Sequence, residues 1–106
     1  MAKPKRPRTE RRQAERALRK TVVDRERLAA AAPGGARDRA IPVPSASVIE
    51  PRALATRCVQ CAGELELRQH AAPPDGGGTL RLVRLVCRLC HTPREIWFTI
   101  ERPLPS

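Results

Sequence analysis

Aromatic side chains are nearly absent from this chain of 106 residues, which has one tryptophan, one phenylalanine and no tyrosine. The two aromatics, Trp97 and Phe98, are adjacent, so they supply area to only one place in a core. Domains this small usually need a metal ion or disulfides in addition to buried apolar area. We therefore expect one small domain that carries an added cross-link.

Long apolar runs are also absent, and no stretch approaches the length that crosses a bilayer. The basic N-terminus is followed by no apolar segment, which is not the pattern of a secretory signal. Its acidic residues, which continue as far as Glu26, argue against a mitochondrial transit peptide. We therefore expect a cytoplasmic protein with reduced thiols, a setting that disfavours structural disulfides.

Patterns typical of enzymes are missing from the sequence. It has no Ser/His/Asp set, no glycine-rich phosphate loop that opens a helix, and no close pair of acid and base carboxylates. The segment Gly76-Gly77-Gly78 follows Pro-Pro-Asp and is typical of a hairpin tip. We therefore expect a protein without catalytic activity.

Positive charge is plentiful but unevenly distributed. The chain has 21 Lys and Arg against 11 Asp and Glu, a net charge of +10. Residues 1–40 hold 13 basic and 5 acidic residues, whereas residues 58–106 hold 6 basic and 5 acidic residues. This asymmetry suggests an arm that binds polyanions, attached to a nearly neutral folded module.

The first half of the chain divides into three segments by composition. Residues 1–8 are basic and interrupted by proline, so we expect a disordered basic tail. Helix formers without Pro or Gly follow a capping threonine, which predicts a basic α-helix over residues 9–32. Residues 33–57 contain four prolines and predict a Pro/Gly/Ala-rich linker, in which a short piece such as Ser47–Glu50 could pack on the domain or add an edge strand.

Residues 58–102 have the alternation of apolar and polar side chains that is typical of strands. Segments 64–68 and 95–101 alternate cleanly, whereas 79–86 is apolar on both faces. A β-bulge or burial on both faces would explain the second pattern. We predict three strands, followed by a C-terminal tail over residues 103–106.

Two Cys-x-x-Cys pairs hold all four cysteines of the chain: Cys58-Val-Gln-Cys61 and Cys87-Arg-Leu-Cys90. Two cysteines at this spacing can bind one metal ion from a single turn, and two such turns complete a tetrahedron of thiolates. Because four thiolates leave no position open for water, we predict one structural zinc ion. Gly63, just after the first pair, can supply the positive φ that such a turn often needs.

Other uses of the cysteines stay open. Iron or a [2Fe–2S] cluster also accepts four thiolates, whereas a redox pair would open a helix, a pattern that neither pair has. His70 and His91 are expected near the site or on the surface, since four thiols already suffice. Arg57, Arg88 and Arg94 either offset the negative charge of the thiolates or point into water.

The order of pair, strand, loop, strand, pair and strand over residues 58–102 resembles the zinc-ribbon superfamily. The resemblance implies a three-stranded antiparallel zinc ribbon, here preceded by a basic N-terminal α-helix and a Pro-rich linker. The resemblance says little about function, because zinc ribbons occur in transcription factors, polymerase subunits, ribosomal proteins and enzymes.

The basic arm indicates binding to nucleic acid, RNA or DNA, because Lys and Arg neutralise phosphates and release counterions. Trp97 is the single candidate for base stacking, with ordinary packing as the alternative. An arm before two cysteine pairs is also similar in composition and order to small zinc proteins of the large ribosomal subunit, which implies rRNA as one target. The candidate nucleic-acid-binding residues are Lys3, Lys5, Arg6, Arg8, Arg11, Arg12, Arg16, Arg19, Lys20 and Trp97.

A protein–protein adaptor is the alternative function. The predicted helix has a thin apolar stripe, which is either a solvated edge or a surface that lies along a partner. The stripe consists of Ala14, Leu18, Val22 and Leu28. Such an adaptor would dock on a transcription or translation machine through the ribbon and the helix.

Overall fold

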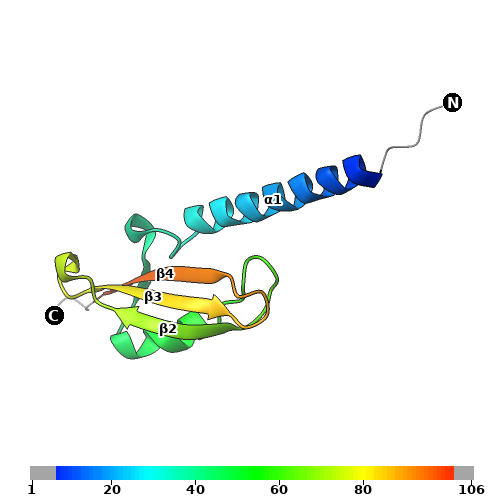
Figure 1. Cartoon of the computed structure of the whole chain (residues 1–106). Coiled ribbons are helices and arrows are strands. Elements are labelled where there is room, and N and C mark those ends of the chain that lie inside the picture. Colours follow the sequence, from blue (N-terminus) through cyan, green and yellow to red (C-terminus); the bar gives the residue numbers. More distant parts are fainter. Residues whose placement is uncertain (1–6, 102–106) are drawn as a thin grey trace, which may run out of the picture.

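A long N-terminal helix leads into a small domain built on one sheet (Figure 1). This computed structural model describes residues 7–101. Most of the predicted basic tail, residues 1–6, and the predicted C-terminal tail over 103–106 lie outside the described residues. The elements are α1 (Pro7–Ala31), η1 (Arg37–Arg39), β1 (Ile41–Val43), η2 (Ala46–Val48), α2 (Ile49–Leu54), β2 (Leu65–Ala71), η3 (Pro74–Gly76), β3 (Leu80–Cys87) and β4 (Pro93–Ile100), where η marks a 3-10 helix.

Helix α1 confirms the predicted N-terminal helix, although it begins earlier than predicted, at Pro7. Proline is favoured in the first turn because its missing N–H would have no partner there. The helix ends where Gly34 adopts a φ of 82°. At Gly35 a Cβ would overlap the carbonyl oxygen of Ala29, so the chain can leave the helix this way only with glycine.

The sheet has four strands in the order β1-β4-β3-β2. Strands β2, β3 and β4 are antiparallel neighbours, whereas β1 is parallel to β4 and pairs Ile41 with Phe98. The three predicted strands correspond to β2, β3 and β4, but the sheet is four-stranded and mixed, so a three-stranded antiparallel ribbon is not confirmed. Strand β1 is three residues long and centred on Pro42, a residue that a sheet tolerates at its edge.

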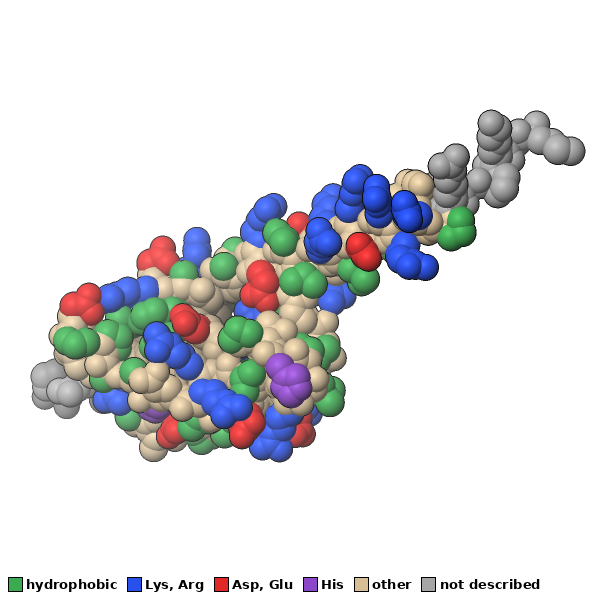
Figure 2. All heavy atoms as spheres, in the orientation of Figure 1, with side chains coloured by type: hydrophobic (Ala, Val, Ile, Leu, Met, Phe, Trp, Pro, Cys, Tyr) green, Lys and Arg blue, Asp and Glu red, His purple; other side chains and the backbone are tan. Residues whose placement is uncertain are grey.

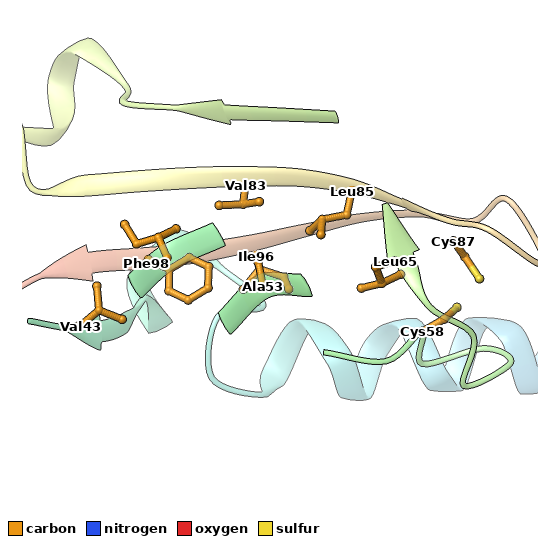
Figure 3. Packing of buried hydrophobic residues seen from close by; sticks show 10 residues of the cluster. Val43, Ala53, Cys58, Leu65, Val83, Leu85, Cys87, Ile96 and Phe98 are labelled. Carbon is orange, nitrogen blue, oxygen red and sulfur yellow. The ribbon is translucent and has the colours of Figure 1, made fainter. Parts of the chain in front are cut away.

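The segment over residues 33–57 forms part of the domain rather than a free linker, and the burial of Ile49 agrees with the expectation that a piece such as Ser47–Glu50 could pack there. After β1 the chain turns through η2 into α2, which lies over one face of the sheet (Figure 3). Ile49 and Ala53, one helical turn apart, are both 0% exposed. Pro51 lies in the first turn of α2, where an N–H has no helical partner. Pro42 and Pro51 thus lie within regular elements at positions that tolerate proline, whereas Pro33 and Pro44 lie at a turn and a bend.

The core lies between the sheet and α2 (Figure 3). Its largest fully buried side chains are those of Phe98, Ile49, Leu85, Val43, Val83 and Cys87. Leu82, on the opposite face of β3, is also buried, so burial on both faces explains the apolar run in this strand. The bulge lies in β2, between Leu67 and Gln69. Because Cys58 also belongs to the core cluster, the cysteine turns are continuous with the core.

Candidate metal centre

The two Cys-x-x-Cys segments form turns with the same backbone hydrogen bonds. In the first turn, the Ala62 N–H donates to the Cys58 carbonyl at 2.8 Å, and the Cys58 N–H donates to the Gly63 carbonyl at 2.9 Å. The second turn repeats both bonds: the His91 N–H donates to the Cys87 carbonyl, and the Cys87 N–H donates to the Thr92 carbonyl, each at 3.0 Å. In both turns, the N–H two residues after the first cysteine donates to its Sγ at 3.4 Å. The sequence repeat is therefore also a structural repeat.

Where the two turns meet, the four sulfur atoms all lie within 4.8 Å of one another. The Sγ atoms of Cys58 and Cys90 are 3.6 Å apart, and those of Cys61 and Cys87 are 3.4 Å apart. Metal–sulfur bonds of about 2.3 Å give a tetrahedron with edges of about 3.8 Å. The four predicted ligands therefore form one cluster that could hold a single metal ion such as zinc.

Each turn contributes one buried and one exposed cysteine. Cys58 and Cys87 are buried against the core, as Figure 3 shows, whereas Cys61 and Cys90 are exposed. The first cysteine of each turn therefore anchors the cluster to the sheet. The second leaves the cluster open to an ion that arrives from solvent.

The positive φ angles of the turns belong to the residues directly after each pair, Ala62 at 62° and His91 at 60°. The prediction that Gly63 supplies the positive φ is therefore wrong. Gly63 is needed for space, because a Cβ there would lie 2.9 Å from the Sγ of Cys87 and 3.2 Å from the Sγ of Cys61. A left-handed residue other than glycine costs about 1–2 kcal/mol, so both turns hold local strain.

The thiols of Cys90 and Cys61 differ in pKa because their hydrogen-bond partners differ. The hydroxyl of Thr92 lies 3.1 Å from the Sγ of Cys90, and hydrogen bonds from this side chain and its backbone lower the pKa of Cys90 to about 6. At Cys61 the Gly63 N–H lowers the pKa, but the Cys87 thiol, partial burial and the other thiols raise it to about 12. A metal ion binds cysteines as thiolates, so its binding would displace protons from these thiols.

Two of the three arginines near the pairs have carboxylate partners. Arg57 lies 3.7 Å from Glu64 in an exposed ion pair, and Arg94 contacts Glu26 of α1 at 2.8 Å. The N–H groups that donate to the sulfurs come from the backbone of the turns. The expectation that arginines offset the charge of the thiolates therefore does not describe these two residues.

The predicted nucleic-acid-binding residues fall in two separate parts of the molecule. Lys3, Lys5 and Arg6 lie outside the described residues. Trp97 is half-buried on β4, where its backbone N–H donates to the Gly34 carbonyl at 2.8 Å. The remaining basic residues are exposed along the N-terminal half of α1 (Figure 2): Arg8, Arg11, Arg12, Arg16, Arg19 and Lys20. The arm is thus one surface, and Trp97 is not part of it.

Sequence reasoning missed the contacts between α1 and the first cysteine turn. Gln60, between two cysteines, donates to the Glu26 carboxylate at 2.8 Å, and Arg94 binds the same carboxylate. Glu26 and Arg94 are 68 positions apart, so no local spacing relates them. The one local signal is a polar residue with a long side chain inside the first pair.

Helix α1 is the longest helix that the structure describes, and eight of its residues are Lys or Arg. Within residues 7–101, no helix is long and apolar enough to cross a membrane.

A comparison with protein families, with curated proteins and with solved structures finds no match to this chain.

Proposed function

We propose that this chain is a non-catalytic zinc protein of the ribbon type, with one zinc ion on Cys58, Cys61, Cys87 and Cys90. The near-tetrahedral spacing of four sulfurs supports this proposal. When bound, zinc would cross-link the two turns, and in small zinc domains such binding adds about 10–16 kcal/mol to folding at neutral pH. A reducing compartment would keep the thiols available for the metal.

Metal analysis of the purified chain tests this part. We expect one zinc ion per chain, and we expect Cys61→Ser to lower the zinc content because it removes one ligand. Iron in place of zinc, or no metal at all, would contradict the proposal.

We further propose that the basic half of α1 binds nucleic acid, RNA or DNA. The observation that carries this proposal is the row of six exposed Lys and Arg side chains on a helix that projects from the domain (Figure 2). Residues 7–20 carry a net charge of +4, and Arg19 reaches Glu15 only at 3.9 Å in an exposed pair. This half-helix is about 21 Å long at 1.5 Å per residue, which is enough to follow several phosphates. Stacking by Trp97 stays a separate prediction.

A binding assay with labelled RNA and DNA oligonucleotides tests the arm. We expect the triple variant with Arg11, Arg12 and Arg16 changed to alanine to bind at least about tenfold more weakly at low salt. A matched triple variant removes the same charge from the exposed domain arginines Arg52, Arg57 and Arg68, and it should bind almost as well as the natural chain. Equal losses in the two variants would rule out a dedicated arm.

A protein adaptor is the second candidate function. Four large apolar side chains of α1, those of Leu18, Val22, Val23 and Leu28, are 67%, 48%, 53% and 72% exposed. A group of exposed apolar side chains on one element can mark a protein-interaction site. A crosslinked pulldown with and without nuclease separates the candidates. A defined protein partner that survives nuclease treatment would favour the adaptor, whereas loss of the captured material would favour nucleic acid.

A further inference from the structure

We propose that the first cysteine turn is a metal-dependent latch that fixes the direction of helix α1. The proposal rests on the zinc ion proposed above and goes beyond it, because it assigns a role to Gln60, Glu26 and Arg94. In this view the metal site does more than stabilise the sheet. It sets where the basic arm points.

Gln60 makes three polar contacts with α1 from its place between two cysteines. Its Nε2 donates to the Glu26 carboxylate at 2.8 Å and to the Val22 carbonyl at 3.1 Å. In return, the Arg25 guanidinium donates to the Gln60 backbone carbonyl at 2.7 Å. One residue of the turn therefore contacts both side-chain and backbone groups over more than one turn of the helix.

The position of Gln60 depends on the cysteines that flank it. Its own N–H donates to the Sγ of Cys58, and the next hydrogen bond of the turn runs from Ala62 to the Cys58 carbonyl. A metal ion that holds the sulfurs of Cys58 and Cys61 would fix both ends of this short turn. Without the ion, the backbone of Gln60 would lose that constraint.

The second cysteine turn reaches the same point on α1 through the start of β4. Arg94, four residues after Cys90, donates to both carboxylate oxygens of Glu26 at 2.8 Å. The Arg94 side chain is only 12% exposed. The Glu26 carboxylate thus accepts hydrogen bonds from Gln60, in the first cysteine turn, and from Arg94, just after the second. It can accept both only when the two turns are held in the right relative position.

Apolar packing does not hold the helix in place. Helix α1 has no buried residue. A groove of about 460 Å³ lies between its C-terminal end and the domain, lined by residues that include Ala29, Val59, Arg94 and Ile96. The turn at Gly34 fixes where the helix ends, since the Gly34 N–H donates to the Arg39 carbonyl at 2.6 Å. The direction of the helix then depends on the polar contacts at the rim of the groove.

In this arrangement, the contacts near one end of α1 set the position of the other end. From Val22 to Pro7 the helix extends about 22 Å beyond the latch at 1.5 Å per residue, so a small rotation at Gln60 displaces the basic residues widely. A fixed arm loses less conformational entropy when it binds an extended polyanion. Zinc would therefore raise the affinity of the arm without any contact between the metal site and the ligand.

Nitrogen-15 relaxation of the zinc-loaded full chain tests the latch. Because the molecule is elongated, we expect one anisotropic rotational diffusion tensor to describe the amides of both α1 and the sheet in the natural chain. The Gln60→Ala variant should keep one zinc ion per chain but give α1 a shorter correlation time than the sheet. Gln69→Ala is the matched control, because Gln69 also takes part in a side-chain hydrogen bond, to Arg84, on the exposed strand β2.

Two results separate failure of the latch from failure of the zinc site. If the purified chain holds no zinc, the proposed metal site is wrong and the latch is wrong with it. If zinc is bound and Gln60→Ala leaves α1 tumbling with the sheet, the latch is wrong while the metal site stands. The test uses the Gln60→Ala variant instead of zinc removal, because removal of zinc from the natural chain could unfold the whole domain.

Discussion

Arg94 binds Glu26 through two N–H···O bonds of 2.8 Å across 68 positions of the sequence. The pair joins β4 to a helix that has no buried residue, so few other contacts carry that junction. Among the described residues, the Nε of Arg94 is buried and has no hydrogen-bond partner. The carboxylate of Glu26 is therefore the main partner of a guanidinium that is largely removed from water.

Glu26→Gln should loosen α1 from the domain, because it removes the charge that pairs with Arg94. Glu26 is itself 41% exposed, so we discount for solvent screening and expect a loss of about 1 kcal/mol. Hydrogen exchange of the amides of residues 25–31 measures the effect, which corresponds to about fivefold lower protection. Glu15→Gln, which disrupts the exposed pair with Arg19, is the control and should change little. Equal protection in both variants would mean that the Arg94 pair contributes nothing.

In the zinc-loaded chain, docking of α1 should not change between about pH 6 and pH 8. Hydrogen bonds from Arg94, and then from Gln60, hold the pKa of Glu26 below its ordinary value despite partial burial. A carboxyl whose pKa is lowered by folding contributes stability that is fully present above its unfolded pKa of about 4.3 and is lost as the pH falls through the lower folded value. Relaxation measurements at both pH values check this. Release of α1 within this range would show that another group controls docking.

Gly63→Ala should weaken zinc binding. A Cβ at this position would lie 2.9 Å from the Sγ of Cys87 and 3.0 Å from the side chain of Leu89, so a ligand would have to move. Overpacking of this kind costs about 1–3 kcal/mol, which predicts about 5- to 150-fold weaker zinc binding in competition with a chelator. At Gly77 an added Cβ would meet open space, so Gly77→Ala should strain the backbone without changing zinc affinity. Unchanged affinity in Gly63→Ala would show that the sulfurs can shift freely.

Ala62→Gly should stabilise the zinc-loaded domain. Ala62 has a φ of 62°, and glycine adopts this conformation without the steric cost of about 1–2 kcal/mol. The greater backbone entropy of glycine offsets part of this gain, which leaves about 0.5–1 kcal/mol. Urea unfolding measures the difference. Ala55→Gly is the control, because Ala55 has a φ of −76° and glycine there adds only flexibility. If both variants lose stability, the turn at Ala62 is not strained.

The cysteine cluster and the three antiparallel strands could be predicted because their signals are local. A spacing of three residues identifies each metal-binding turn, and alternation over a few residues identifies a strand. The first helix could also be predicted, since no Pro or Gly interrupts residues 9–32. In each case a short window of sequence contains the physical cause of the structure.

The fourth strand and helix α2 could not be predicted because their causes are distant. Strand β1 exists through parallel pairing of Ile41–Val43 with β4, some 57 positions later, and its central Pro42 hides it from any local pattern. Ile49 and Ala53 are buried only because α2 lies on the sheet. The contacts of Glu26 are likewise satisfied by residues that fold against it from the far end of the chain.

The salt dependence of binding should identify which arginines contact phosphate. Each contact that is removed lowers the slope of log K against log salt by about 0.9 for duplex DNA and about 0.7 for single strands. Arg12 is exposed on α1, so Arg12→Ala should lower the slope by one such step, whereas Arg52→Ala on α2 should leave it unchanged. Titrations over a series of salt concentrations measure the slopes. If Arg12→Ala weakens binding without changing the slope, Arg12 does not contact phosphate, and its effect comes from the helix or from a protein partner.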